Sequence, residues 1–223
     1  MSLRGILVVV ALAVLGGCAA PPPPPPPAPP PTITLLNPDQ ACLAELDQDH
    51  VAFRPLQSFG IGRCHIANPV RLSGRSPAWN RPGVLSCEMA RRLVEFEDEV
   101  VQPLAQRYFG QGVRRLNHYG TYDCRTRRNA ASVAAARMGT SRGGRLSEHA
   151  MGRAIDVAGF QLDDGTEISV RRDWWSGGSR GQFLRALARA SCDRFSVVLT
   201  PNHDRLHRDH IHLDIGPYTL CGI

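Results

Sequence analysis

The 223-residue sequence contains no lysine, so each of its 26 basic residues is an arginine. Twenty acidic residues leave a formal net charge of +6 at pH 7, and aromatic residues make up only 6% of the chain. The arginines are scattered, whereas nucleic-acid-binding domains typically gather basic residues into one patch or stripe. The composition therefore does not favour nucleic acid as a partner.

Long apolar runs are also lacking. The run at residues 6–15 is about half as long as the roughly 20 apolar residues that a membrane-spanning helix needs. It follows Arg4 and ends in Gly16-Gly17-Cys18, which is the layout of a secretory signal that is removed. We therefore expect residues 1–17 to be a signal peptide and not a membrane span.

The segment Leu15-Gly16-Gly17-Cys18 resembles a bacterial lipobox, in which the cysteine is acylated and begins the mature chain. An ordinary signal peptide with an incidental cysteine is the alternative. The resemblance implies that Cys18 anchors the protein to a membrane, and Ala19 in place of an aspartate implies the outer membrane. Residues 21–31 are proline except for Ala28, a composition that adopts polyproline II. We expect residues 18–33 to form a lipid-bearing stalk on the periplasmic side.

Cysteine pairs at C-x-x-C spacing are absent, which argues against a cysteine zinc site. Six cysteines follow Cys18, and an even count in an oxidising compartment indicates disulfide bonds. Six cysteines allow many pairings, of which we expect the sequential one. The expected disulfides are Cys42 with Cys64, Cys87 with Cys124, and Cys192 with Cys221.

The pattern of apolar residues predicts a single α+β domain over residues 34–223. Apolar residues spaced by three and four follow Ser86, which predicts an amphipathic helix that bends near Pro103 and ends at Gly110. Asp163-Asp164-Gly165 predicts a hairpin turn between residues 154–160 and 167–170. Further strands are expected at residues 113–122, 196–200 and 210–215, and a second helix around residues 183–188. We expect a small antiparallel sheet with flanking helices, stapled by disulfides.

The last expected strand alternates polar and apolar residues without error. His210, His212 and Asp214 fall on one face, and Ile211, Leu213 and Ile215 fall on the other. The apolar face belongs on a core, so the histidine face must look into a cleft or into solvent. Neutral imidazole is the commonest metal ligand, although this segment alone also fits a surface histidine cluster.

A second segment, Ser147 to Asp156, places His149 and Asp156 seven residues apart. A fully extended chain would separate them by more than ~20 Å, so a turn must lie between two ligands of one ion. Gly152 permits such a turn. Asp156 lies in an apolar strand, where a carboxylate needs a partner such as a metal.

These residues resemble known motifs. Ser147, His149, Gly152, Ala154 and Asp156 match the S-x-H-x-x-G-x-A-x-D motif of the zinc peptidases that act on D-alanyl peptides of peptidoglycan. The run His207-x-x-His210-x-His212 is similar to the penicillin-insensitive murein endopeptidases of that group. Over most of residues 40–223 the chain resembles the bacterial extensin-like C-terminal domain family, which is related to the same peptidases.

The resemblance implies a zinc peptidase-like fold with His149, Asp156 and His212 as ligands of Zn2+. Three protein ligands leave the fourth position to water, which is typical of a catalytic site. His210 would be the general base, and His207 would support it or stabilise the oxyanion. The carboxypeptidase branch has a glutamate base where Asp209 stands, so Asp209 and Glu148 remain alternatives to His210.

Arg125 stands where the group has an arginine that grips a substrate carboxylate, a task that suits a guanidinium. Arg127 and Arg128 are close enough to compete, and a solvated arginine run is the alternative. The implied function is hydrolysis of peptide cross-links in peptidoglycan by an endopeptidase. A D,D-carboxypeptidase, a non-catalytic peptidoglycan-binding lipoprotein, and a zinc hydrolase of esters or amides outside the wall are the alternatives.

Overall fold

The computed structural model describes residues 38–49, 51–74, 77–127 and 144–223. The expected signal peptide, Cys18 and the expected stalk lie outside the described residues, as does Arg128. The described residues belong to one compact unit, Leu36–Ile223. None of the described helices has the length and apolar character needed to cross a bilayer.

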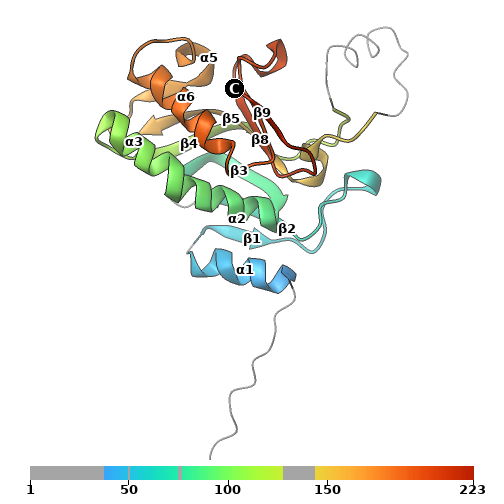
Figure 1. The fold of residues 1–223 in the computed structure, drawn as a ribbon. Helices are drawn as coiled ribbons and strands as arrows, with labels where there is room; N and C mark the ends of the chain where they lie inside the picture. Colours follow the sequence, from blue (N-terminus) through green and yellow to red (C-terminus); the bar gives the residue numbers. More distant parts are fainter. Residues whose placement is uncertain (1–37, 50, 75–76, 128–143) are drawn as a thin grey trace, which may run out of the picture. The chain divides into compact units, whose positions relative to one another are not determined.

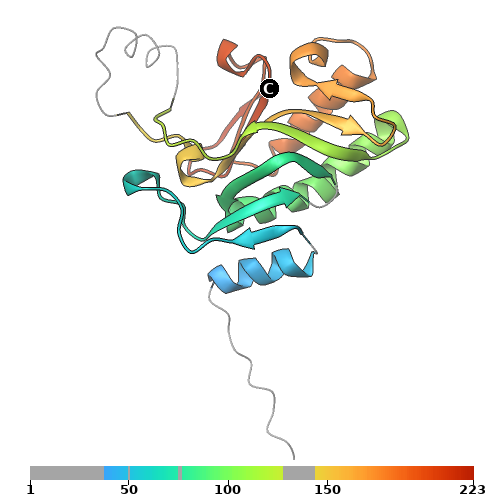
Figure 2. The same cartoon turned by 180° about the vertical axis from the view of Figure 1, so that it is seen from behind.

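Nine strands within the described residues form one mostly antiparallel sheet (Figures 1 and 2). Their order is β1-β2-β3-β4-β5-β8-β7-β9, and β6 pairs with β5 outside this path. The strands are β1 Phe53–Pro55, β2 Pro69–Gly74, β3 Ala78–Ser86, β4 Val113–Gly120, β5 Ala154–Leu162, β6 Glu167–Ser169, β7 Val197–Leu199, β8 Ile211–Asp214 and β9 Leu220–Gly222. The predicted α+β class is confirmed. Two pairs, β3 with β4 and β7 with β9, are parallel, which the sequence did not predict.

Helices α2, α3 and α6 cover one face of the sheet, which lies behind them in Figure 1 and in front of them in Figure 2. The helices are α1 Pro38–Gln48, α2 Cys87–Phe96, α3 Gln102–Phe109, α5 Val170–Asp173 and α6 Ser179–Ser191. Leu93 of α2, Phe160 of β5 and Phe183 of α6 are buried together in the core between the two layers. The opposite face of the central strands is therefore left for polar residues.

The predicted long helix begins and ends where expected. The Ser86 side chain accepts a hydrogen bond from the backbone N–H of Met89 at 3.3 Å, and Gly110 ends α3 with a left-handed φ of 68°. Between α2 and α3 lies a π-helical turn, Glu97–Val101. Pro103 has no N–H to donate to the preceding turn, and the π-helical turn lies at that position.

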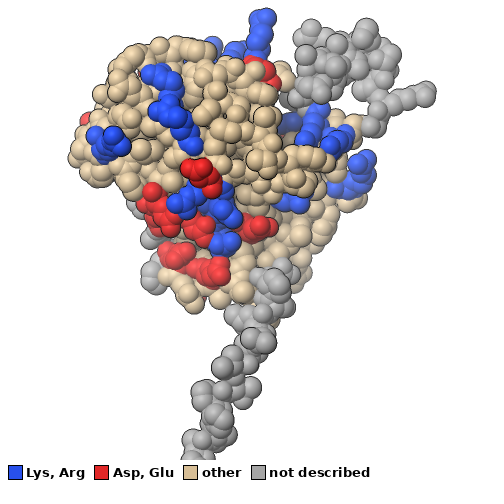
Figure 3. Space-filling model, viewed as in Figure 1, with Lys and Arg blue, Asp and Glu red and all other residues tan. Residues whose placement is uncertain are grey.

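Ion pairs at the outer surface of the helical layer join neighbouring helices. Arg91 of α2 pairs with Glu45 of α1 at 3.2 Å, and Arg194, which follows α6, pairs with Glu99 of the π turn. Figure 3 shows acidic and basic side chains interspersed over this face. The helical layer is held mainly by the packing beneath it, because ion pairs as exposed as these contribute little to stability.

Three disulfides staple the domain, and two of the expected pairings are wrong. The observed pairs are Cys42–Cys87, Cys64–Cys124 and Cys192–Cys221, of which only the last was predicted. Cys42 lies on α1, which packs against α2, where Cys87 is the first residue. Cys64 lies beside the segment after β4, where the Tyr122 hydroxyl donates to the Cys64 carbonyl at 3.1 Å. The cysteine pairing follows from contacts between segments that are far apart in the sequence. It does not follow from how close two cysteines are along the chain.

Candidate metal centre

Strands β5 and β8 place Asp156 and His212 directly opposite each other. The two residues are partners in the antiparallel register, and Asp156 Oδ1 lies 2.9 Å from His212 Nδ1. Their neighbours Ile155 and Leu213 point into the helix-covered core. Because side chains alternate along a strand, Asp156 and His212 point to the opposite face. The predicted alternation of the two faces is thus confirmed, but the strand is not half-buried: all four residues of β8 are buried, and its polar face lines a pocket.

A tight turn brings His149 to the same point. A short 3-10 helix, Glu148–Met151, is followed by Gly152 with φ 62° and ψ 25°. A Cβ at Gly152 would lie 2.8 Å from the Ser86 backbone nitrogen, so the turn needs glycine in both conformation and space. His149 Nε2 lies 3.1 Å from Asp156 Oδ1 and 3.2 Å from His212 Nδ1. The three predicted ligands therefore converge.

The far nitrogen of each imidazole is held by a hydrogen bond. His149 Nδ1 lies 2.7 Å from the Thr121 carbonyl oxygen, and His212 Nε2 lies 3.0 Å from Asp214 Oδ2. Both oxygens accept, so these nitrogens donate to them, and the nitrogens that face the cluster are the ones that a metal ion can bind in place of a proton. Metal-binding histidines are commonly oriented in this way. The sequence placed Asp214 on the histidine face, but no residue pattern pointed to the Thr121 carbonyl.

The three donor atoms fit one small cation. Two zinc ligands at about 2.1 Å and a tetrahedral angle lie about 3.4 Å apart. The donors here all lie within 4.8 Å of one another, with observed separations of 2.9–3.2 Å. Two imidazoles and one carboxylate suit zinc and other first-row transition metals. Because Asp156 and His212 both line a pocket, a fourth position would face that pocket.

The charges of the cluster also favour a bound cation. Burial lowers the pKa of His212, but hydrogen bonds to Asp156 and Asp214 outweigh it and raise the pKa to about 9. Burial raises the pKa of Asp156, yet hydrogen bonds from His149 and His212 hold it well below its usual value. Two carboxylates thus flank one imidazole, and either a proton or a metal ion can supply the positive charge.

The two predicted catalytic histidines line the same pocket, each paired with a carboxylate. His210 Nδ1 lies 2.9 Å from Asp209 Oδ1, and its Nε2 lies 3.6 Å from Asp156 Oδ1. His207 Nδ1 lies 2.7 Å from Asp204 Oδ1. The His207 and His210 rings are 5.1 Å apart between centroids. Both histidines therefore stand beside the three candidate ligands, as predicted.

The alternative bases are engaged with other partners. Asp209 is the residue that holds His210. Glu148 is 4% exposed, and its two oxygens pair with Arg127 at 2.8 Å and Arg153 at 2.7 Å. Asp209 is thus engaged through one oxygen, whereas Glu148 is paired through both.

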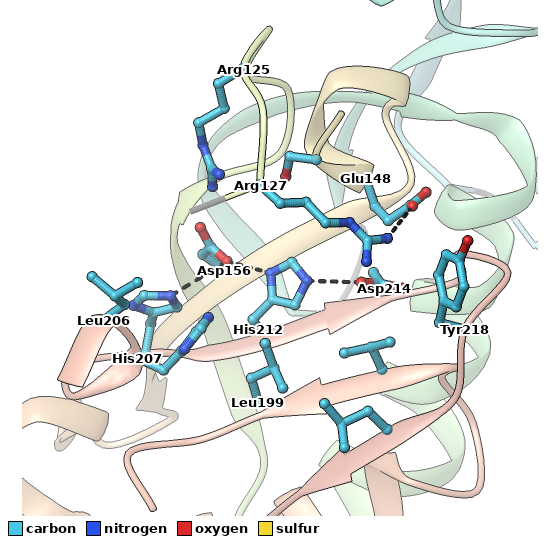
Figure 4. Close-up of a pocket in the computed structure, with 14 residues that line it drawn as sticks. Arg125, Arg127, Glu148, Asp156, Leu199, Leu206, His207, His212, Asp214 and Tyr218 are labelled. Carbon is cyan, nitrogen blue, oxygen red and sulfur yellow. Dashed lines mark hydrogen bonds and ion pairs between the residues drawn. The ribbon is translucent and has the colours of Figure 1, made fainter. Parts of the chain in front are cut away.

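The pocket has a volume of about 330 Å³ and combines cationic and apolar walls (Figure 4). Arg125, the residue predicted to bind a carboxylate, lines it with its Nε 2.7 Å from Asp123 Oδ2, and Arg127 lines it as well. The Arg127 guanidinium lies 5.1 Å from the Tyr218 ring centre. The apolar wall comes from Leu199, Leu206 and Leu220, among others. This mixture suits a ligand with both carboxylate and apolar groups.

A known protein family matches almost the whole described domain. The family described as "Extensin-like protein C-terminus" matches residues 40–222. This range includes the three candidate ligands and both pocket histidines. No curated protein and no solved structure matches the chain.

Proposed function

The chain belongs to the extensin-like C-terminal family, and from that membership and the pocket geometry we propose that it is a zinc-dependent peptidoglycan hydrolase. The reaction we propose is endopeptidase cleavage of peptide cross-links. The observation that carries the proposal is the convergence of His149 Nε2, Asp156 Oδ1 and His212 Nδ1 at the wall of a pocket. Three protein ligands with one open position are typical of catalytic zinc, whereas structural zinc is fully enclosed by protein.

The three ligands are the residues that would hold the zinc. When bound, zinc would polarise the scissile carbonyl and lower the pKa of a nearby water toward ~7. The resemblance of the two motifs to the zinc D-alanyl peptidases supports this metal and this class of substrate.

His210 is the side chain best placed to move the proton. Asp209 holds its Nδ1–H, so the neutral ring presents a free Nε2 toward the cluster. It would take a proton from the attacking water and return it to the leaving amine. Asp209 then serves as a positioning residue, which accounts for an aspartate at the place where the carboxypeptidase branch has glutamate.

His207 plays a different part in this scheme. Burial lowers its pKa, an effect that Asp204 only partly offsets, so the ring is mainly neutral at pH 7. With its Nδ1–H bound to Asp204, the neutral ring has only an acceptor at Nε2. The His207 ring can therefore support His210 or accept a hydrogen bond from a substrate N–H. It is less suited to donating a hydrogen bond to an oxyanion.

We propose that the protein acts on the cell wall from a lipid anchor at Cys18, on the periplasmic side of the outer membrane. Three disulfides within the described domain fit an oxidising compartment. Metabolic labelling with a palmitate analogue tests the anchor, with Cys18→Ser as the control. Label retained by the variant would contradict it.

The reaction is tested by incubating the purified protein with cross-linked sacculi, with and without a chelator, and separating the muropeptides by chromatography. The proposal predicts a metal-dependent loss of cross-linked dimers that is absent in His212→Ala. Loss of only the terminal D-alanine of monomers would replace the endopeptidase with a carboxypeptidase. Unchanged muropeptides despite bound zinc would contradict both and favour a non-catalytic wall-binding protein.

A further inference from the structure

A second hollow lies on the same sheet face as the candidate metal centre. It has a volume of about 530 Å³, and Tyr119, Ala158 and Arg171 are among the residues that line it. Ala158 follows Asp156 by two positions on β5, and Val157 between them is buried in the core. Residues two apart on a strand point to the same face. The second hollow, called the Tyr119 groove below, therefore begins next to Asp156.

Tyr119 lines the groove and contacts His210, which lines the metal pocket. It is next to Gly120, the residue of β4 that pairs with Asp156 across the sheet. Its ring centre lies 5.9 Å from that of His210, edge to face, and half of the side chain is exposed. Tyr119 thus lies beside the proposed base, with an open aromatic surface.

From Asp156 the Tyr119 groove lies toward Ala158, and the rest of the metal pocket lies in the opposite direction along β5. Ala154 precedes Asp156 by two positions and pairs with Asp214, which lines the pocket together with Arg127 and Tyr218. Figure 4 shows Tyr218, Arg127 and Asp214 on one side of His212 and Asp156 on the other. The candidate metal centre therefore lies between two binding regions and not at the closed end of one.

The Tyr119 groove has cationic groups to offer. Arg171 and Arg172 line it and are exposed. Arg171 forms no ion pair with any residue that the structure describes, and Arg172 lies at the limit of a contact with Asp173, at 4.0 Å. The acidic residue of the groove, Glu167, accepts hydrogen bonds from Gln161 at 2.7 Å and Asn117 at 3.4 Å. An exposed aromatic ring beside uncommitted guanidinium groups suits a peptide segment that carries a carboxylate.

We propose that the substrate lies across the candidate metal centre. The part on one side of the scissile bond lies near Arg127 and Tyr218, and the part on the other side binds in the Tyr119 groove. A carboxylate of that part is held by Arg171. This inference rests on the proposed function and specifies its substrate class: a peptide held on both sides of the cut bond, such as a cross-link. An enzyme for chain ends needs a site that closes around the terminal group, whereas this site continues in both directions.

The test compares two purified muropeptides, a cross-linked dimer and an uncross-linked monomer. Their binding to zinc-loaded full-length His210→Ala, in which turnover is suppressed, is measured by calorimetry. We expect the dimer to bind more tightly than the monomer. Adding Arg171→Ala should weaken dimer binding by about tenfold, as for the loss of one charge-assisted hydrogen bond, and leave monomer binding within about twofold. Ala158→Trp, which fills the groove, should do the same.

Arg180→Ala is the matched control, because Arg180 is an exposed arginine that lines a different hollow. It should leave both affinities unchanged, and zinc content should be equal in all variants. Equal binding of dimer and monomer, or no effect of Arg171→Ala and Ala158→Trp on dimer binding, would contradict the proposed role of the Tyr119 groove. Either result would leave the proposed function standing. Failure of both muropeptides to bind would instead contradict the proposed function.

Discussion

Asp214 accepts a hydrogen bond from His212 Nε2 at 3.0 Å, and this contact turns the Nδ1 of His212 toward Asp156 and His149. A carboxylate in this position fixes the ring and increases the basicity of the nitrogen that faces the metal. The Gly216 backbone N–H holds the other Asp214 oxygen at 2.8 Å, so the carboxylate is itself positioned.

Asp214→Asn should therefore weaken zinc binding by about 10- to 100-fold while the domain stays folded. Competition with a chromogenic chelator measures the affinity. Asp209→Asn is the control, because Asp209 contacts His210 and none of the three candidate ligands. It should leave zinc affinity unchanged and lower turnover. Equal zinc affinity in wild type and Asp214→Asn would show that the contact does not support the metal.

His210→Ala should keep its zinc and lose activity. Removal of a general base commonly costs about 10²- to 10⁴-fold in rate. Elemental analysis and the sacculus digestion measure the two properties on one preparation. If His210→Ala loses zinc and His212→Ala retains it, the roles of the two histidines are reversed.

Stability of the metal-free domain should fall as the pH rises. The pKa of His212 is about 9 in the folded chain against 6.5 for an ordinary histidine, so its protonated form stabilises the fold. This contribution is fully present below about pH 6.5 and is lost as the pH rises through 9, an effect on the order of 3 kcal/mol. Urea unfolding in excess chelator from pH 6 to 9.5 measures it.

Asp214→Asn removes one of the two carboxylates that raise the pKa of His212, so the pH dependence of its metal-free form should be shallower. Saturating zinc should also remove the dependence, because the cation takes the place of the proton. A metal-free wild type whose stability is constant or rises from pH 6.5 to 9 would contradict the assigned charge state.

Much of the site follows from the sequence because it depends on local geometry. Strand alternation placed His212 on the other face of the strand from the apolar Ile211 and Leu213. The spacing of His149 and Asp156 required a turn, which Gly152 makes. The cysteine pairing could not be derived in this way, since Cys42 meets Cys87 only after α1 has packed on α2. Likewise, the Thr121 carbonyl is a backbone group with no sequence signature.

Gly152→Ala tests the turn that presents His149. The left-handed backbone and the 2.8 Å approach to the Ser86 nitrogen predict a loss of about 1–3 kcal/mol in the free energy of unfolding. Gly177→Ala is the matched control, because a Cβ there meets no atom within 4 Å. Equal stability of the two variants would mean that the turn adapts to a side chain. We expect Gly152→Ala also to bind zinc more weakly.

In the proposed site, His149, Asp156 and His212 together hold one catalytic zinc ion. Metal analysis of the wild type and of Asp156→Ala, both purified and dialysed in the same way, tests it most directly. The account predicts one zinc per chain in the wild type and little in Asp156→Ala, with circular dichroism showing that both are folded. Stoichiometric zinc that persists in folded Asp156→Ala, or a wild type that binds none, would contradict it.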